Sequence, residues 1–477
     1  MRGIGLVSSV LLHVSIIRYR MNNTHIRTWS FVSRCICILA GVALVAWVSS
    51  CDQPQDPEPL QPGRADSLAM FSKAFSPPES CATCHPRHYR EWEESMHAYS
   101  IEDPVFHSMN AEGLKATNGL MGEFCTGCHA PIATQLSEAN GGVLKANLSP
   151  AGKRGVTCDA CHKSESQLPG MVSTKYRLDG VMYGPISDPV PNTFHGSKGR
   201  ADFDKSIQCA GCHDVVNPRG VQVEATYTEW ASSSYPGRDI SCQVCHMKWE
   251  PGQAAVGGPA DRRVHSHYMD GVDIPLKEFP GRDAMIQRVL DQLRYTVKAQ
   301  LYAPASVVRG TRVPLNVEVI NTITGHNVPS GTIFERQMWV QVEVINDQGD
   351  TVFKSGMQDP QGDLCNENSE YVAKGLVPKD TSLVMFHGKA FRLGKEIPFF
   401  FDADAIVNLT IPPYETRNAR YAISPAAYAA STSLRVNARI YMRALPPYFL
   451  RKLGHADLVK FLPNFLMESM QAEVSIK

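Results

Sequence analysis

The sequence has no excess of charge of either sign and no apolar run that would comfortably span a membrane. Its 47 Lys and Arg equal its 47 Asp and Glu, and no basic run is present that would favour nucleic-acid binding. The apolar run at residues 35–48 has 14 residues, whereas a membrane-spanning helix needs about 20. These absences argue against a nucleic-acid-binding protein and against a transmembrane helix.

Cysteine is scarce outside one repeated motif. Ten of the 14 Cys belong to five copies of Cys-x-x-Cys-His, which we number motif 1 (81–85), motif 2 (125–129), motif 3 (158–162), motif 4 (209–213) and motif 5 (242–246). Two thiols at this spacing can each add to one vinyl group of a haem, and the His that follows can bind the iron as proximal ligand. The sequence therefore predicts five haem c groups. The attachment residues are Cys81, Cys84, Cys125, Cys128, Cys158, Cys161, Cys209, Cys212, Cys242 and Cys245, and the proximal ligands are His85, His129, His162, His213 and His246.

Two other uses of cysteine fit this pattern less well. Cys-x-x-Cys is half of many zinc sites, but zinc ligand pairs usually come from separate segments and do not need a His after every second Cys. A disulfide framework would need neither the fixed spacing nor the repeated His. Haem attachment is the interpretation that uses every residue of the motif.

The N-terminal residues are typical of an exported bacterial lipoprotein. Arg27 and Arg34 precede the apolar run at 35–48, which has the length of a signal-peptide core. The run ends in Val48-Ser49-Ser50-Cys51, similar to the box in which the Cys is diacylated. We therefore expect a signal peptide over 1–50, with Met21 as an alternative start, a lipidated Cys51, and a flexible tether over 51–77 that is rich in Pro, Gln and Asp.

The rest of the chain divides into two patterns. Residues 78–290 hold all five motifs, and so little polypeptide lies between them that the porphyrins must form most of the core. From about 291 to 445, apolar and polar residues alternate, as in Val313, Leu315, Val317 and Val319, which favours an immunoglobulin-like β-sandwich. Residues 446–477 show helical spacing. The expected fold class is α+β multidomain, with a mostly α or irregular haem domain, a sandwich and a short helical tail.

A repeat within the motif segment suggests how the haems pair. Cys125 and Cys158 are separated by the same number of residues as Cys209 and Cys242, and similar sequences, 154–157 and 238–241, introduce the second motif each time. This repeat predicts two equivalent haem pairs, from motifs 2 and 3 and from motifs 4 and 5, with the haem of motif 1 outside them.

Short stretches outside the motifs carry a resemblance to a known family. They are Tyr89, Trp92, Ser95, His97 and Ala98 after motif 1, Tyr183-Gly184-Pro185 and His195 before motif 4, Glu229-Trp230 before motif 5, residues 266–271 after motif 5, and residues 325–331 with Arg336 and Trp339. Together they resemble the multihaem cytochromes typified by the tetrahaem electron carrier that serves hydroxylamine oxidation in nitrifying bacteria. That tetrahaem carrier lacks both the fifth haem and the appended β domain.

The resemblance implies His97, His195 and His267 as distal iron ligands, followed by His107 and His326. An electron carrier usually fills both axial positions of its iron. Nine His outside the motifs and the leader make five distal ligands possible. They are His88, His97, His107, His195, His265, His267, His326, His387 and His455. His265 is the rival of His267, and Met96, Met109 or Met269 are alternative ligands.

These observations favour a multihaem cytochrome that transfers electrons in the cell envelope as part of a respiratory chain. It would face the periplasm or the cell exterior, be anchored by lipid, and exchange electrons with donor and acceptor proteins. The alternative is an enzyme that acts on a small nitrogen or sulfur compound at one haem with an open distal position. A docking subunit of a larger respiratory complex is compatible with the first reading. Pentahaem nitrite reductases carry one Cys-x-x-Cys-Lys site, whereas all five motifs here end in His.

Overall fold

The computed structural model describes residues 74–165, 169–170 and 174–477. The expected signal peptide, the lipidation site Cys51 and nearly all of the expected tether lie outside the described residues. The described residues belong to one compact unit, residues 66–477. Within the described ranges, no helix has the length and apolar character needed to span a bilayer.

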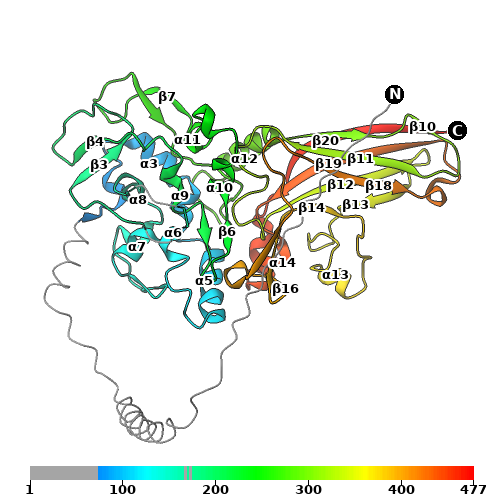
Figure 1. The fold of residues 1–477 in the computed structure, drawn as a ribbon, viewed down its shortest axis with the longest axis horizontal. Coiled ribbons are helices and arrows are strands. Elements are labelled where there is room, and N and C mark those ends of the chain that lie inside the picture. The colour runs from blue at the N-terminus through cyan, green and yellow to red at the C-terminus, as the bar shows by residue number, and fades with distance from the viewer. Residues whose placement is uncertain (1–73, 166–168, 171–173) are drawn as a thin grey trace, which may run out of the picture. The chain divides into compact units, whose positions relative to one another are not determined.

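The first part of the chain, which we call the motif region (74–296), consists of short helices and two-stranded pairs joined by loops (Figure 1). Its helices are η1 (Pro78–Ser80), α3 (Pro86–Glu93), α4 (Met96–Tyr99), α5 (Pro104–Ala116), α6 (Thr126–His129), α7 (Pro131–Gln135), η2 (Gly152–Arg154), α8 (Cys158–His162), α9 (Ile207–Ala210), α10 (Thr226–Ala231), η3 (Pro236–Arg238), α11 (Cys242–His246) and α12 (Arg282–Thr296). Its strands are β1 (Ala139–Asn140), β2 (Val143–Leu144), β3 (Val181–Gly184), β4 (Gly196–Gly199), β5 (Val215–Val216), β6 (Gln222–Glu224), β7 (Trp249–Gly252) and β8 (Arg262–His265).

Motifs 2, 3 and 5 lie on short helices of their own, α6, α8 and α11. In motifs 3 and 5 all five residues form the helix, α8 and α11, and in motif 1 the helix α3 begins at Pro86, directly after His85. Proline is well suited to this first helical position, because its fixed φ is helical and its missing N–H would have no partner there. Helices this short have little stability of their own, so packing must hold them in place.

The second part, the strand region (297–477), contains three sheets (Figure 1). A six-stranded sheet has the order β10-β20-β19-β12-β13, with β14 also pairing to β12. The other two have the orders β18-β11-β9 and β16-β15-β17. The strands are β9 (Val297–Tyr302), β10 (Ser306–Val307), β11 (Val313–Asn321), β12 (Gln337–Asn346), β13 (Thr351–Ser355), β14 (Val384–Phe386), β15 (Gly388–Arg392), β16 (Lys395–Ile397), β17 (Ala405–Asn408), β18 (Thr416–Ile423), β19 (Ser433–Arg443) and β20 (Phe465–Ile476). The helices here are α13 (Glu370–Ala373), η4 (Phe400–Asp402), η5 (Pro425–Tyr428), α14 (Pro447–Lys452) and η6 (Ala456–Phe461).

The alternating pattern in the sequence does correspond to strands with one buried face. Val313, Leu315, Val317 and Val319 of β11 are all buried, and they share one hydrophobic core with residues of β12, β18, β19 and β20. The immunoglobulin-like topology is not confirmed, however. The sheets are small and mixed, and β10 pairs with β20 in parallel. What the structure supports is a mixed helix-and-strand protein of more than one part.

The expected helical tail is wrong for its second half. Residues 447–452 and 456–461 are helical, but β20 then runs from Phe465 to Ile476 along the edge of β19. Phe465 is buried and Leu466 is exposed, which is the period of a strand. Main-chain hydrogen bonds to β19 and burial against the core stabilise the strand more than the helical spacing of the apolar residues would stabilise a helix.

The boundary expected at residue 290 falls inside α12. Met285, Val289 and Leu293 of this helix are buried in the same core as the strands. The motif region and the strand region are also tied by polar contacts. Arg336 binds both carboxylate oxygens of Asp273, at 2.6 and 2.7 Å. The two regions therefore meet through a continuous packed junction.

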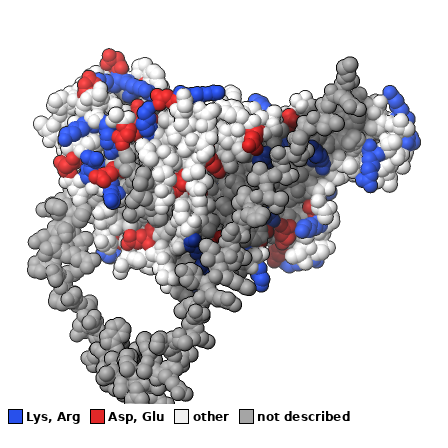
Figure 2. All heavy atoms as spheres, viewed as in Figure 1, with Lys and Arg blue, Asp and Glu red and all other residues white. Residues whose placement is uncertain are grey.

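Charge on the face shown in Figure 2 is mixed. Lys and Arg side chains lie among Asp and Glu side chains over the motif region, and neither sign forms a continuous field on that face. This distribution agrees with the absence of a basic stripe in the sequence.

Candidate haem-binding site

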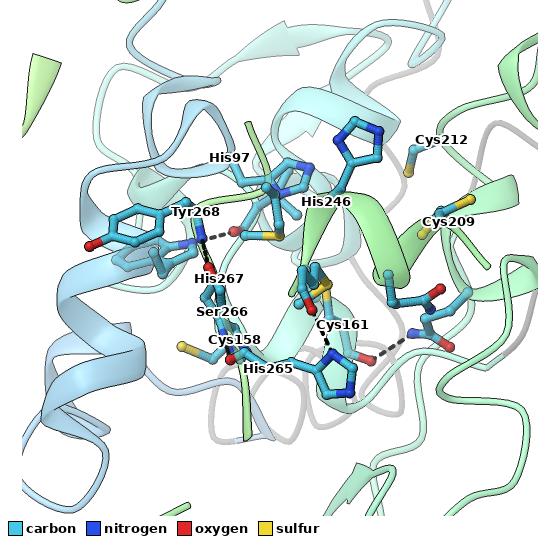
Figure 3. A pocket seen from close by; sticks show the side chains of 18 of the residues that line it. His97, Cys158, Cys161, Cys209, Cys212, His246, His265, Ser266, His267 and Tyr268 are labelled. Atoms are coloured by element: carbon cyan, nitrogen blue, oxygen red, sulfur yellow. Dashed lines mark hydrogen bonds between the residues drawn. The ribbon is translucent and has the colours of Figure 1, made fainter. Parts of the chain in front are cut away.

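All ten Cys and all five His of the motifs line one cavity of ≈ 2430 Å³. Drug-sized ligands occupy pockets of about 300–1,000 Å³, so this cavity has room for several large groups. Its lining also includes the loop at 323–332 of the strand region. Figure 3 shows cysteines of motifs 3 and 4 together with His97, His246 and the 265–268 segment around this space.

The thiols show which motifs are neighbours. Cys81 of motif 1 contacts Cys158 of motif 3, Cys128 of motif 2 contacts Cys212 of motif 4, and Cys209 of motif 4 contacts Cys242 of motif 5. The expectation that motifs 2 and 3 form a pair is therefore wrong. Motif 4 is instead the neighbour of both motif 2 and motif 5. The sequence repeat reflects similar local segments, whereas the folding of the chain decides which motifs touch.

The alternatives to haem gain no support from this arrangement. All cysteines among the described residues are free thiols. The same part of the chain contains no group of three or more His, Cys, Asp or Glu side chains that could hold a single metal ion. Each motif instead presents its thiols and its imidazole separately to the cavity, as a large ligand would require.

Four of the five motif histidines face a second imidazole across the cavity. The pairs and their ring-centre distances are His85 with His195 at 6.4 Å, His162 with His267 at 6.3 Å, His213 with His97 at 6.3 Å, and His246 with His326 at 6.3 Å. Two imidazoles that bind one metal from opposite sides, each through a nitrogen about 2 Å away, leave their ring centres about 6 Å apart. The four pairs fit a metal with two axial imidazole ligands.

The ring nitrogens of these histidines are oriented for the same role. In motifs 1, 3 and 5, Nδ1 donates to a main-chain carbonyl, that of Ala254, Tyr183 and Asp270 respectively, at 2.6–2.8 Å. Among the opposing histidines, Nδ1 of His195, His267 and His326 donates to a carbonyl of a residue one or two positions away, at 2.8–2.9 Å. Nδ1 of His97 lies 3.0 Å from Sδ of Met269. Each contact fixes the ring and leaves Nε2 for the metal.

Motif 2 is arranged differently. The ring that stacks against His129 is that of Phe106, with centres 4.8 Å apart. His107, a candidate distal ligand, adjoins Phe106, but its Nε2 lies 2.8 Å from the carbonyl oxygen of Ile101. The Nε2 atom of His107 is thus engaged by the main chain, unlike the Nε2 atoms of the four paired distal histidines. The structure does not pair His107 with another imidazole at the separation seen in the other four motifs.

The remaining candidates lie near the cavity in other roles. Nδ1 of His265 contacts the carbonyl of Met247, and its Nε2 lies 3.5 Å from Asp204. His88 packs its ring edge-on against both His85 and His267. Neither histidine stands opposite a motif imidazole as the four pairs do. Nε2 of His455 contacts Ser108.

Burial lowers the pKa of His97, His267 and His326 and keeps these three imidazoles neutral, which is the form that binds metal. Burial lowers the pKa of His97 and of His326 to about 4. Burial also lowers the pKa of His213, but the nearby Glu224 carboxylate more than offsets this and raises it to about 9. Close to motif 2, burial raises the pKa of Asp103 and of Glu335 to about 7.

The loop that carries His326 is held at both ends. It follows β11, and Val328 exchanges two main-chain hydrogen bonds with Ile411, both of 2.9 Å. From the motif region, Glu229 of α10 accepts hydrogen bonds from the Asn327 main chain at 3.1 Å and from the Ser330 hydroxyl at 2.6 Å. His326 of the strand region thus reaches motif 5 on a loop that hydrogen bonds hold to both regions.

Sequence reasoning missed the acidic residue that contacts a motif histidine. Glu224 Oε1 lies 3.4 Å from Nδ1 of His213. No motif marks this residue, because the contact depends on a short hairpin that returns the chain to motif 4. The only signal in the sequence was an acidic side chain a few residues after a motif.

Comparison with known proteins agrees with this geometry. Residues 80–163 match the family described as "Cytochrome c554 and c-prime". The structure is similar to that of a penta-heme cytochrome c552 from Thermochromatium tepidum, with a TM-score of 0.58 and 20% sequence identity over 84% of this chain and 99% of that chain. Part of the chain also matches a β-glucosidase structure from Listeria innocua, with 9% identity over 38% of this chain and 16% of that chain and a TM-score of 0.15, too low to carry an argument. The comparison with curated proteins finds no match. These findings, together with the five motifs, support the interpretation of this chain as a multihaem c-type cytochrome.

Proposed function

We propose that this protein is an electron-transfer cytochrome that binds five haem c groups and exchanges electrons with redox protein partners in the cell envelope. The observation that carries the proposal is the set of four opposed imidazole pairs in a cavity lined by all five attachment motifs. When bound, haem supplies one-electron exchange at its iron. A closely spaced series of such groups suits electron transfer.

The proposed ligand set follows from the pairs. His85, His129, His162, His213 and His246 are the proximal ligands. His195, His97, His267 and His326 are the distal ligands at motifs 1, 4, 3 and 5 respectively. Saturating both axial positions of an iron prevents small molecules from competing with electron transfer. We also propose that the strand region, which supplies His326, is related to the immunoglobulin-like domains appended to other multihaem proteins.

The haem count tests this proposal directly. A pyridine haemochrome assay and the intact mass of the purified protein should each give five haems per chain. Three or fewer haems, together with bound zinc, would contradict the proposal.

Anchoring in the envelope is a separate part of the proposal and rests on the sequence at residues 35–51. We expect Cys51→Ala to release haem-loaded protein from the membrane fraction, because the diacylated thiol would be lost. Ser50→Ala, which keeps the thiol, is the matched control. Membrane association that is the same in Cys51→Ala and in the parent protein would argue against the lipid.

One observation favours a second function. The ring of Phe106 stacks against His129. Nε2 of His107, which follows Phe106 in the sequence, lies at a main-chain carbonyl. Two carboxyl groups with raised pKa values, Asp103 and Glu335, line the same part of the cavity. An iron with an open position beside proton donors could reduce or oxidise a small nitrogen or sulfur compound. Binding of nitric oxide or cyanide to one haem per chain would support this function, and five unreactive haems would exclude it.

A further inference from the structure

The proximal histidines differ in what their Nδ1 atoms meet. In motifs 1, 3 and 5 the partner is a neutral main-chain carbonyl at 2.6–2.8 Å. In motif 4 the partner is a carboxylate, because Glu224 Oε1 lies 3.4 Å from Nδ1 of His213. This difference is chemical and not only geometric, since a carboxylate carries a negative charge and accepts a hydrogen bond more strongly than a carbonyl does.

The fold holds Glu224 in this place. Strands β5 and β6 form a hairpin directly after motif 4, and their register sets Glu224 opposite Val215, two residues beyond His213. The chain then closes back on the motif, because the Tyr227 main-chain N–H donates to the His213 carbonyl at 3.0 Å. The Thr228 N–H donates to the Asp214 carboxylate at 2.6 Å. The Glu224 side chain is only 16% exposed, so solvent screens its charge weakly.

In the part of the chain that the structure describes, no Lys or Arg forms an ion pair with Glu224. The field of Glu224 reaches Arg336, but both carboxylate oxygens of Asp273 bind that guanidinium, at 2.6 and 2.7 Å. Among the described residues, the ion pair of Glu224 is the one with His213. Its negative charge acts most directly on the imidazole of motif 4, which it contacts, and its field also reaches His129 of motif 2.

A carboxylate on the outer nitrogen of a metal-bound imidazole makes the ligand more electron-rich. An electron-rich ligand and a nearby negative charge both favour the more positive oxidation state of iron, and hydrogen bonding to the ligands is one of the means by which proteins set haem potentials. Motif 4 is also the neighbour of both motif 2 and motif 5, through Cys212 and Cys209. A change of potential there affects every transfer between those two.

We propose that Glu224 is a positioning residue that lowers the reduction potential of the haem held by Cys209, Cys212 and His213. The potential of this haem is then lower than it would be with a neutral partner at Nδ1 of His213. The inference rests on the proposed function, because it requires iron on His213. Glu224 itself is neither an iron ligand nor an attachment residue.

The test is a spectroelectrochemical titration of holoprotein carrying Glu224→Gln, which keeps the shape of the side chain and removes its charge. One of the five midpoint potentials should rise while the others move much less. Glu224→Asp, which retains the carboxylate, should move that potential less than Gln does. Glu138→Gln is the matched control, because Glu138 lies in the same region and hydrogen-bonds Ser149 rather than a motif histidine.

The haem count is measured on every sample, so that two kinds of failure are distinct. Three or fewer haems in the parent protein, together with bound zinc, would contradict the proposed function itself. Five haems whose potentials are the same in the parent and in Glu224→Gln would overturn the role of Glu224, and so would an equal shift of all five. If the Gln variant does not accumulate, Glu224→Asn is compared with Glu224→Asp, and the same potential should be higher in Asn.

Discussion

An imidazole can bind a metal only through a nitrogen that nothing else occupies. In His85, His162 and His246 the main chain takes Nδ1 and leaves Nε2 free. His326 follows the same rule, whereas His107 has its Nε2 at a carbonyl oxygen. The choice of nitrogen therefore separates these two candidates, which the sequence ranked equally.

His326→Ala should convert one low-spin haem to high-spin and shift its potential, because the imidazole opposite His246 would be lost. The absorption spectrum and a redox titration of the variant measure both effects. His387→Ala is a matched control, because His387 belongs to the strand region but does not line the cavity. If His326→Ala kept as many low-spin haems as the parent protein, His326 would be a loop residue without a ligand role.

Because the carboxyl of Glu335 is buried, we expect the stability of the protein to depend on pH. Burial raises its pKa from 4.5 to about 7, so the folded protein binds more protons than the unfolded chain between these two values. The free energy of unfolding therefore falls as pH rises from about 4 to 7, because the buried carboxyl of Glu335 ionises less readily than it does in the unfolded chain. This destabilisation is complete above pH 7. Glu335→Gln removes the ionisable group and should stabilise the protein at pH 8 by roughly 2–3 kcal/mol, with little effect at pH 4.5.

Denaturant unfolding of the holoprotein at the two pH values measures this difference. Glu396→Gln is the control, because Glu396 is exposed and lies on the edge strand β16. A Glu335→Gln variant that is less stable than the parent at pH 8, with the same pH dependence as the parent, would refute the assignment.

The residues that the sequence identified well are those whose chemistry is local. Cys-x-x-Cys-His specifies its own thiols and its own proximal ligand, so all fifteen motif residues could be named in advance and all line the cavity. The partner of His246 depends on a loop that lies 80 residues later in the sequence. The contact between Glu224 and His213 depends on a hairpin register. No short-range pattern encodes either.

Among the elements, the short helix α4 depends on its neighbours for its position. The Val156 N–H donates to the His97 carbonyl at 3.0 Å, and the indole N–H of Trp92 donates to the Val156 carbonyl at 2.7 Å. Gly155 makes this approach possible. Its φ is +68°, and a Cβ there would lie 2.6 Å from the His97 carbonyl oxygen.

Gly155→Ala should therefore destabilise the protein by about 1–3 kcal/mol and disturb the haem between His97 and His213, because α4 must move to admit the methyl group. Denaturant unfolding and the low-spin signals of the oxidised protein measure the two effects. Gly180→Ala is the matched control, since Gly180 has a φ of +72° but no atom within 4 Å of the added Cβ. If the two substitutions had equal effects, backbone strain alone would explain them, and Gly155 would have no role in placing His97.

The tail shows where element prediction failed and why. Leu458, Phe461, Leu462 and Phe465 have helical spacing, yet the helical segment ends at Phe461 and a strand begins at Phe465. The strand exists because β19 offers a partner along nearly its whole length. By contrast, β11 was recognisable because its own residues alternate and one face is buried.

On the scale of the whole molecule, residues of both the motif region and the strand region line the cavity. The described motif region has small hydrophobic clusters of its own beyond the cores it shares with the strand region. A space of ≈ 2430 Å³ at its centre is lined by the fifteen motif residues and by the loop of His326. In the proposed holoprotein, haems in this space would take the place of a conventional core, and the loop of His326 from the strand region lines part of it.

The most direct measurement is a spin count by low-temperature electron spin resonance of the fully oxidised protein. The four imidazole pairs predict four low-spin haems, and the arrangement of Phe106 and His107 at His129 predicts one high-spin haem per chain. Five low-spin haems would contradict the assignment at motif 2. Fewer than four low-spin haems in a protein that carries five would contradict the paired-imidazole account itself.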